Sequence, residues 1–412
     1  MLLKVLVYEH LSGGGQAGQP IPSGILSEGF GMLRTIVSDF KAAGHEVTVL
    51  FDGRLSKLNP PLLADCTIPI FYPQETQKLL TDVARVNDAI YVIAPETGQT
   101  LQSWIQFVEQ MGKISLNCES SAIQKVGDKA VLSETLEENG LPTPQTLVVN
   151  VNDDLERIKH NIRSSSDYPV IIKPIDGVSC SGLSIVKQDD EVEAAVAKVK
   201  RGSQKKHFVV QQFVNGKTAS VTLLCAGGKA SAISLNRQDI KYAKPEEPSN
   251  YEGGMVPFDH ALKQEAFKVT EKTVKSIPGL RGYVGVDLIL AKNKPFILEI
   301  NPRLTTSYVG LSKISDFNIA QSLIEAVLNE QLPDKYATIG SVCFSKVETP
   351  KPNTSIFQKV AKMSEVVSPP FPLDDNTKAC SLVAGQGNSL DEACIQFEEA
   401  EKLLRDIISG GK

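Results

Sequence analysis

Cysteine is scarce and scattered in this chain of 412 residues: there are seven cysteines, and no two of them form a Cys-x-x-Cys pair. That pattern excludes a structural zinc knot and argues against a disulfide framework, so we expect a reducing, cytoplasmic setting. Long apolar runs are also lacking, and no stretch approaches the roughly 18 residues of a membrane span. The opening MLLKVLVYEH becomes charged too soon for a signal peptide and is more typical of a first strand.

A strong charge of one sign is lacking as well. The chain has 43 Lys and Arg against 48 Asp and Glu, a net charge of −5, and no basic block. Nucleic acid is therefore not an expected partner. The five histidines show no metal-ligand spacing. What the chain does have is 42% hydrophobic residues, enough for large cores, and a length that predicts roughly two to three domains.

Strand-like and helical patterns alternate over residues 1–118, which predicts an N-terminal α/β domain. An apolar strand at 4–8 is followed by a helical stripe over 27–43 and a second strand at 46–51. Another buried strand is expected at 89–94, before a further helix. This alternation is typical of an open parallel sheet.

The pattern changes near residue 119 and predicts a second unit over 119–333. Its short strands and intervening helices are less regular than those of the first unit. The tail, 334–412, is expected to be a small α/β appendage whose last helix is capped by Ser389. The strands expected after residue 119 lie at 169–173, 183–186, 208–213, 219–225, 230–234, 283–290 and 296–300.

A glycine pattern after the first strand matches a dinucleotide-binding fingerprint but lacks its context. Gly13, Gly15 and Gly18 have the G-x-G-x-x-G spacing. The fingerprint needs its third glycine at a helix start, whereas Pro20 and Pro22 follow here and the helical stripe begins later. We therefore reject a nicotinamide site and predict a flexible loop that closes on a different ligand, with an inert loop as the alternative.

The segment GYVGVDLILAKNKPFILEINPRL has the pattern of a β-hairpin, in which two apolar strands flank a polar turn. With the loop at 292–294, strand pairing places Asp287 opposite Glu299, and Asn301 shares the face of Glu299 because side chains alternate. Three oxygen-bearing side chains on an apolar hairpin indicate a hard cation, Mg²⁺ or Mn²⁺. The alternative is that the carboxylates pair with Arg303 or with a lysine.

Upstream of the hairpin, the chain carries the groups that a nucleoside triphosphate needs. Lys129 and Lys173 offer two cations, and a loop of small residues after Lys173 lets backbone N–H groups approach phosphate oxygens. A later strand offers an extended backbone edge to which an adenine can hydrogen-bond. The loop comprises Asp176, Gly177, Val178, Ser179, Cys180, Ser181 and Gly182, and the edge comprises Gln211, Gln212, Phe213 and Val214.

The order of these features over residues 120–310 resembles that of the ATP-grasp superfamily of carboxylate–amine ligases. Each feature alone also fits a surface lysine or an ordinary turn, so it is the order that is specific. The resemblance implies an α/β fold with α+β elements, the ATP-grasp fold. Its parts would be an N-terminal open parallel-sheet domain, a mobile lid near 145–212, and a C-terminal catalytic domain that carries the hairpin. ATP would lie between lid and hairpin.

The resemblance also implies roles for single residues. Lys129 and Lys173 would contact phosphates, the small-residue loop would cover them, and the edge strand would bind adenine. This edge reads QQFV, whereas many family members have a glutamate first. Arg303, together with Arg237, would stabilise the oxyanion and the transferred phosphoryl group. Two Mg²⁺ or Mn²⁺ ions would be held by Asp287, Glu299 and Asn301.

A closer resemblance links the chain to the tyramine–glutamate ligase group of methanofuran biosynthesis. It is carried by YEHLSGGG, ILSEGFGML, DGVSCSG and INPRLTTSYVGL. It implies that ATP activates the side-chain carboxylate of glutamate as an acyl phosphate, which tyramine then attacks with release of ADP and phosphate. The alternatives are an ATP-grasp ligase for another amino acid–amine pair, or an ATP-binding regulator without turnover.

Candidate substrate residues follow the first parallel strands, because ligands bind beyond the carboxyl ends of strands in an open sheet. An acidic residue there would pair with an ammonium group, the alternative being a solvated loop acid. Hydroxyl groups after the hairpin would bind a carboxylate or the acyl phosphate. We expect small-molecule substrates and, as the commonest symmetric assembly, a homodimer. The candidate substrate residues are Glu9, Gly13, Gly14, Gly15, Glu96, Thr97, Thr305, Thr306 and Ser307.

Overall fold

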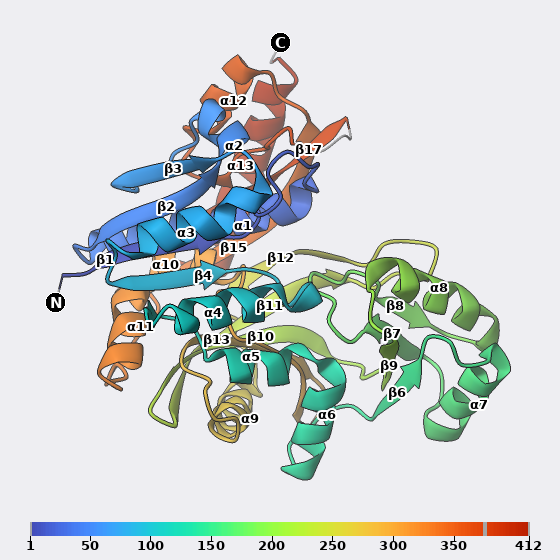
Figure 1. Cartoon of the computed structure of the whole chain (residues 1–412). Helices are drawn as coiled ribbons and strands as arrows, with labels where there is room; N and C mark the ends of the chain where they lie inside the picture. Colours follow the sequence, from blue (N-terminus) through green and yellow to red (C-terminus); the bar gives the residue numbers. More distant parts are fainter. Residues whose placement is uncertain (1, 374–376, 411–412) are drawn as a thin grey trace.

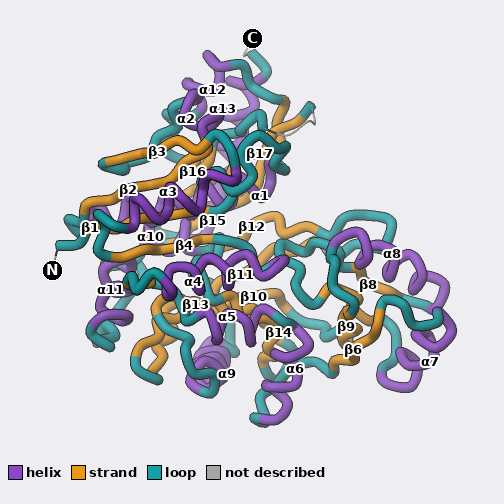
Figure 2. The backbone as a smooth tube through the Cα atoms, viewed as in Figure 1, coloured by secondary structure: helices purple, strands orange, loops and turns teal. Residues whose placement is uncertain are grey.

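The computed structural model describes residues 2–373 and 377–410 and arranges them around three sheets (Figure 1). A five-stranded sheet lies in the N-terminal part, a four-stranded sheet stands apart from it, and an eight-stranded sheet connects the two regions. The tube view separates the four-stranded unit, with its two helices, from the rest of the chain (Figure 2). The α/β class expected from the sequence is confirmed.

The N-terminal sheet is parallel throughout and has the order β3-β2-β1-β4-β5. Alternate residues of β1 face two different cores: Val5 and Val7 pack with helix α1, while Leu6 and Tyr8 pack on the opposite side. A sheet covered on both faces needs such apolar strands. Its strands are β1 (Lys4–Glu9), β2 (Glu46–Asp52), β3 (Cys66–Ile70), β4 (Ala89–Ile93) and β5 (Ile114–Ser115).

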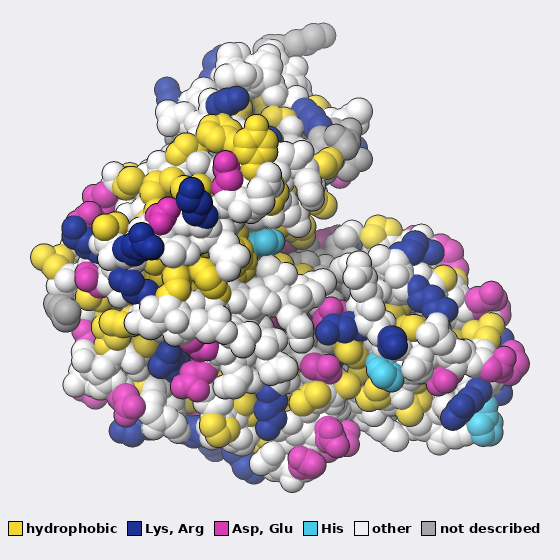
Figure 3. All heavy atoms as spheres, in the orientation of Figure 1, with side chains coloured by type: hydrophobic (Ala, Val, Ile, Leu, Met, Phe, Trp, Pro, Cys, Tyr) yellow, Lys and Arg dark blue, Asp and Glu magenta, His cyan; other side chains and the backbone are white. Residues whose placement is uncertain are grey.

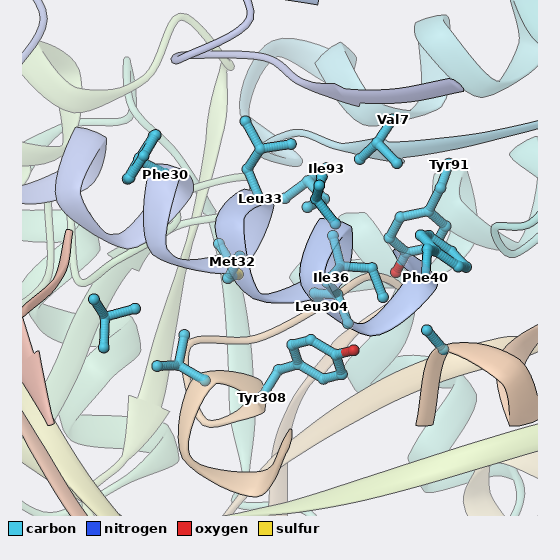
Figure 4. Packing of buried hydrophobic residues seen from close by; sticks show 14 of the residues in the cluster. Val7, Phe30, Met32, Leu33, Ile36, Phe40, Tyr91, Ile93, Leu304 and Tyr308 are labelled. Atoms are coloured by element: carbon cyan, nitrogen blue, oxygen red, sulfur yellow. The ribbon is translucent and has the colours of Figure 1, made fainter. Parts of the chain in front are cut away.

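Six helices belong to this part of the chain and to its junction with the next. Helix α1 lies between the parallel sheet and the segment after the hairpin, so that its buried side chains meet Leu304 and Tyr308 (Figure 4). The helices are α1 (Ser23–Ala42), α2 (Gly53–Leu58), α3 (Thr76–Ala84), α4 (Thr100–Gln110), α5 (Ser120–Gly127) and α6 (Lys129–Glu138).

The four-stranded sheet, in the order β6-β9-β7-β8, is antiparallel and has a hydrophobic core of its own under α7 and α8. This unit corresponds to the expected lid. Its elements are β6 (Thr146–Asn150), α7 (Leu155–Ser165), β7 (Val170–Pro174), β8 (Ser184–Val186), α8 (Val192–Gly202) and β9 (His207–Gln212).

The eight-stranded sheet is antiparallel, in the order β14-β13-β10-β11-β12-β15-β17-β16. Strand β11 is longer than expected, and β12 and α10 were not predicted. The strands are β10 (Lys217–Ala226), β11 (Lys229–Lys241), β12 (Asn250–Val256), β13 (Gly282–Leu290), β14 (Pro295–Asn301), β15 (Ser341–Pro350), β16 (Val366–Ser368) and β17 (Lys378–Gly387). The helices are α9 (Lys263–Lys275), α10 (Tyr308–Ile314), α11 (Ile319–Leu328), α12 (Thr354–Val360) and α13 (Leu390–Ile408).

The C-terminal segment, expected to be an appendage, instead continues the large sheet. Strand β15 pairs with β12, and β17 and β16 extend the sheet beyond it. The predicted cap of the last helix is confirmed, since Ser389 Oγ accepts a hydrogen bond from Glu392 N at 3.2 Å. The domain boundaries at 118 and 333 stay predictions.

The β13–β14 hairpin has the expected pairing but a different turn. Leu290 pairs with Pro295, so the loop is Ala291–Lys294 rather than 292–294. A four-residue loop alone would place Asp287 opposite Leu298. The register shifts by one residue between Leu288 and Asp287, which is a β-bulge on β14, and Asp287 therefore faces Glu299.

No helix within residues 2–373 and 377–410 combines the length and the apolar character that crossing a bilayer requires. The cytoplasmic setting and the homodimer stay predictions from the sequence.

Candidate active site

Three polar side chains of the hairpin meet on one face, as the sequence predicts. Asp287 and Glu299 are direct neighbours across β13 and β14, and Asn301 Nδ2 donates a hydrogen bond to Asp287 Oδ2 at 3.0 Å. Gln238, on β11, donates to Asp287 Oδ1 at 2.8 Å and was not predicted. Burial, and then the adjacent Glu299 carboxylate, raise the pKa of Asp287 from 3.8 to about 6. Asp287 is thus buried beside a second acid and, in the part of the chain that the structure describes, has no ion-pair partner of its own.

Two lysines reach the same place from different elements. Lys129, at the start of α6, donates to Glu299 Oε1 at 3.0 Å and to the backbone oxygen of Gly177 at 2.7 Å. Lys173, at the end of β7, donates to Gln211 Oε1 at 3.0 Å. Burial, and then the charge of Lys129, lower the pKa of Lys173 to about 8. Both lysines are poised to bind an anion between lid and hairpin.

Lys129 also bears on the alternative that the hairpin acids merely pair with a lysine. Glu299 does have such a partner. Among the described residues, Asp287 has none, and its two hydrogen bonds come from the amides of Gln238 and Asn301. The lysine pairing therefore accounts for one carboxylate and leaves the other uncompensated.

The residues fit a hard divalent cation. The donors are two carboxylates and an amide oxygen, the type of ligand that Mg²⁺ and Mn²⁺ prefer. The described part of the chain holds no cluster of three or more His, Cys, Asp and Glu side chains, so no purely protein-made cage of that kind competes with this set. The remaining ligands of an ion here would be phosphate oxygens and water.

The small-residue loop covers the lysines. Ser179, Cys180 and Gly182 have φ values of 49°, 63° and 71°, a left-handed backbone that lets consecutive turns fold tightly. Burial raises the pKa of the Cys180 thiol to about 12, so this cysteine remains a neutral lining residue.

Asp176, the first residue of the loop, points elsewhere. Its carboxylate accepts hydrogen bonds from Ser203 Oγ at 2.6 Å and from Gly98 N at 3.1 Å, while Thr97 Oγ1 donates to its backbone oxygen at 2.9 Å. Thr97 and Asp176 therefore fasten the loop to the N-terminal domain. Neither of them lines the cleft beside the hairpin.

Arg303 closes the other side of the hairpin site. Its Nη2 donates to Glu96 Oε2 at 2.8 Å, and both side chains are buried, at 14% and 5% exposure. The alternative of Glu96 as a solvated loop acid is wrong, because this carboxylate is the partner of Arg303; its pairing with a substrate ammonium group stays a prediction, and Glu96 does not line the cleft. A buried guanidinium with one carboxylate partner keeps further N–H groups for an anion in the cleft.

Most of the predicted site groups border one cleft, and the molecular surface is hollowed where the lid meets the rest of the chain (Figure 3). Other residues that line the cleft were not predicted, because neither the strand pattern nor the helix pattern marks them as site residues. Among them, Glu28 lies in the segment ILSEGFGML, which carries the family resemblance but was not assigned a role. The predicted residues that line the cleft are Lys129, Lys173, Gly177, Val178, Ser179, Cys180, Ser181, Asp287, Glu299, Asn301, Arg303, Thr305, Thr306 and Ser307. The additional ones are Glu28, Pro174, Leu183, Ser220, Gln238, Ile240, Tyr242, Tyr251 and Leu298.

Arg237 does not reach the cleft, so its predicted catalytic position is wrong. Its guanidinium pairs with Asp239, with Nε to Oδ1 at 2.9 Å and Nη2 to Oδ2 at 3.0 Å. Successive side chains of a strand point to opposite faces, and here Gln238 and Ile240 are the ones that line the cleft.

Glu9 and its glycine loop do not line the cleft either. The Glu9 carboxylate accepts hydrogen bonds from Ser12 N and Ser12 Oγ, both at 2.6 Å, and from Leu11 N at 3.2 Å. Glu9 is only 2% exposed, so it is also not a solvated acid. The residues Gly13, Gly14 and Gly15 fold back on this strand end, with Gly13 N bonded to Glu9 O at 2.7 Å. They form a closed turn rather than an open ligand loop.

None of the four residues of the expected adenine edge lines the cleft. Gln211 is buried and holds Lys173, as described above. Gln212 and Val214 do not border the cleft, and the Phe213 ring lies 6.4 Å from that of Tyr242, which does. Their contact with adenine stays a prediction.

Comparison with known proteins agrees with this geometry. The family model described as "ATP-grasp domain" matches residues 126–307, and that described as "pre ATP-grasp 3 domain" matches residues 45–123. Tyramine–L-glutamate ligase of Methanocaldococcus fervens is 30% identical over 314 residues, which cover 76% of this chain and 91% of that protein.

Two solved structures show the same fold. L-amino acid ligase from Bacillus licheniformis superposes with a TM-score of 0.64 at 15% identity, over 97% of each chain. The biotin carboxylase domain dimer of Hydrogenobacter thermophilus 2-oxoglutarate carboxylase, in complex with MgADP, ADP and bicarbonate, has a TM-score of 0.71 at 14% identity. That match covers 99% of this chain and 94% of the other.

Proposed function

Since the chain belongs to the ATP-grasp family of carboxylate–amine ligases, we propose that it joins the side-chain carboxylate of glutamate to tyramine, with release of ADP and phosphate. This would be the step of methanofuran biosynthesis that the sequence resemblance implies. The support for this pair of substrates is the 30% identity to tyramine–L-glutamate ligase across 91% of that protein. ATP-grasp enzymes bind ATP with Mg²⁺, and in this proposal the nucleotide would lie between the lid loop and the hairpin.

The observation that carries the proposal is the convergence of two lysines, two carboxylates and an arginine in one cleft. Lys129 and Lys173 would bind phosphate oxygens of ATP beneath the loop that follows β7. Asp287, Glu299 and Asn301 would hold the divalent ions, which neutralise charge on the β- and γ-phosphates.

The chemistry has two steps. A glutamate carboxylate oxygen attacks the γ-phosphorus, the bond from that phosphorus to ADP breaks, and an acyl phosphate forms. The neutral amine nitrogen then attacks the acyl carbon, the bond from that carbon to the phosphate oxygen breaks, and the proton that the nitrogen loses goes to the departing phosphate as the amide forms. Arg303 would stabilise the oxyanion and the departing phosphate, because its guanidinium is buried and fixed by Glu96.

Water must be kept from the acyl phosphate. The small-residue loop lies over the cleft, and Thr97 and Gly98 fasten its first residue, Asp176, to the N-terminal domain. These hydrogen bonds join the loop to the N-terminal domain, and a lid that closes over the cleft protects a reactive intermediate from water.

ADP release measured with MgATP, L-glutamate and a panel of amines tests the proposal. We expect ADP only when glutamate and an amine are both present, tyramine to be the best amine, and the product to have the mass of the γ-glutamyl amide. If another amine stimulates ADP release and tyramine does not, the chain is an ATP-grasp ligase for a different pair. That second candidate is favoured by the modest identity of 30%.

A further inference from the structure

A second ion pair stands at the wall of the same cleft, away from the hairpin acids: its carboxylate, Glu28, lines the cleft, whereas Lys346 is not among the lining residues. Glu28 on α1 and Lys346 on β15 meet with Oε1 and Nζ 2.8 Å apart. Glu28 Oε2 also accepts a hydrogen bond from Thr306 Oγ1 at 2.9 Å. The two side chains are 9% and 18% exposed, so the pair is withdrawn from bulk water but not sealed.

The pair borders the reaction site rather than the outer surface. Glu28 and Thr306 both line the cleft, and Thr306 follows Arg303 by three residues on the same segment. Lys346 Nζ lies 5.8 Å from the ring centroid of Tyr251, which is itself a lining residue. Three distant parts of the chain therefore supply one polar corner: the first helix, the segment after the hairpin, and the C-terminal strands.

A carboxylate and an ammonium group side by side form a template for a zwitterion. Burying such a pair has a desolvation cost that apolar residues at the same positions would avoid, so a purely structural contact has no need of these charges beside a cavity. An amine alone would satisfy only Glu28, and a carboxylate alone only Lys346. An α-amino acid satisfies both, with charge-assisted hydrogen bonds to each partner.

We propose that Glu28 binds the α-ammonium group and Lys346 the α-carboxylate of the amino-acid substrate. This inference rests on the proposed ligase function and adds the determinant of which carboxylate reacts. With the α-carboxylate held at Lys346, the side-chain carboxylate is the one that extends along the cleft toward Arg303 and the hairpin. The C-terminal segment, through Lys346, thereby becomes part of the substrate site.

The experiment combines two nearly isosteric variants with two substrate analogues. Glu28→Gln and Lys346→Met are compared with wild type, using L-glutamate, N-acetyl-L-glutamate and the α-amide of L-glutamate, with MgATP and tyramine. Glu348→Gln is the matched control, because Glu348 stands two residues from Lys346 on the same strand and has an exposed ion pair with Lys378. ADP release gives KM and kcat, and calorimetry gives glutamate affinity in the presence of magnesium and a non-hydrolysable ATP analogue.

Each variant is expected to lose recognition of one group of the amino acid, either the α-ammonium group or the α-carboxylate, and to keep recognition of the other. Glu28→Gln should raise the KM for glutamate at least about tenfold and leave the KM for the N-acetyl analogue unchanged, since that analogue has no ammonium group. Lys346→Met should behave in the same way toward the α-amide. The KM for ATP should stay within about twofold in both variants. The control should match wild type throughout.

The outcomes separate this inference from the function on which it rests. If both variants ligate glutamate with wild-type KM, the ion pair is structural and the inference fails while the ligase function stands. If wild type shows no turnover with tyramine but binds glutamate in a way that needs both Glu28 and Lys346, the function fails and the pair is supported. If wild type accepts both analogues as well as glutamate, or binds no glutamate at all, the inference is overturned even where a variant does not fold.

Discussion

The protein without bound metal is expected to become more stable when Asp287 loses its charge. Burial and the neighbouring Glu299 raise the pKa of Asp287 from 3.8 to about 6. The folded state therefore holds this proton more tightly than the unfolded state does. The stability that the neutral form contributes is fully present below about pH 4 and is lost as the pH rises through about 6. The substitution Asp287→Asn places a neutral side chain here at every pH, so this pH-dependent loss of stability does not occur.

The size of the effect follows from the shift and from two hydrogen bonds. A rise of about two pKa units corresponds to about 3 kcal/mol of unfolding free energy at pH 8. Asp287 accepts from Gln238 and from Asn301, and an amide at this position presents a donor to one of them, which costs about 1 kcal/mol. The net gain for Asp287→Asn is about 2 kcal/mol at pH 8 and below about 1 kcal/mol at pH 5.

Thermal unfolding in EDTA at pH 5 and pH 8 measures this difference. We expect the variant to unfold at a higher temperature than wild type at pH 8, with the gap narrowing at pH 5. Asp239→Asn is the control, because Asp239 pairs with Arg237 at 41% exposure outside the cleft and should move the midpoint little at either pH. Magnesium with ADP should stabilise wild type and not Asp287→Asn. A variant that is less stable than wild type at pH 8, or a gap independent of pH, would refute the reasoning.

Glu299→Gln is expected to lower the rate of ADP release at least about a hundredfold while ATP binding stays measurable by calorimetry, because a proposed metal ligand is lost and both lysines remain. A wild-type rate would remove the metal-site argument. Lys173 has a pKa of about 8 caused first by burial, so ATP affinity should fall as the pH rises from 7 to 9, and Lys173→Met should abolish this dependence. An equally steep dependence in the variant would assign it to another group. Arg237→Gln should keep kcat and KM within about twofold of wild type, since its partner Asp239 lies outside the cleft; a large loss of kcat would return Arg237 to the reaction.

The hairpin site could be predicted because the residue pattern that defines it lies within one short segment of the chain. Alternation along two apolar strands is enough to place Asp287, Glu299 and Asn301 on one face. The predicted loop was one residue too short, and the pairing of Asp287 with Glu299 is still as predicted because the bulge on β14 compensates. Without that bulge, Glu299 would turn to the opposite face of the sheet, so a feature invisible in the hydrophobic pattern decides the register.

Other residues were placed wrongly or missed because the partners of their side chains are not determined by the local sequence pattern. Arg237 has the same sequence context as Gln238, and only the orientation of β11 decides which of them faces the cleft. Glu9 lies at the carboxyl end of a parallel strand, as a ligand residue would, but its own loop returns and saturates the carboxylate. Glu28 and Lys346 are 318 residues apart, so their pairing depends on the path of the whole C-terminal segment.

The charges beside the hairpin balance one another, and this bears on why the family needs a divalent cation. Two acids on β13 and β14 and a third at Arg303 stand against three cationic groups, so the cluster as a whole is neutral and attracts a polyanion only weakly. The charges are nevertheless distributed unevenly. Lys129 also binds the lid loop, and Arg303 pairs with Glu96. Asp287 therefore accepts hydrogen bonds from amide groups alone. A divalent ion held at that carboxylate would supply the excess positive charge that ATP needs and would relieve the repulsion between the two hairpin acids. The six groups in this balance are Glu96, Lys129, Lys173, Asp287, Glu299 and Arg303.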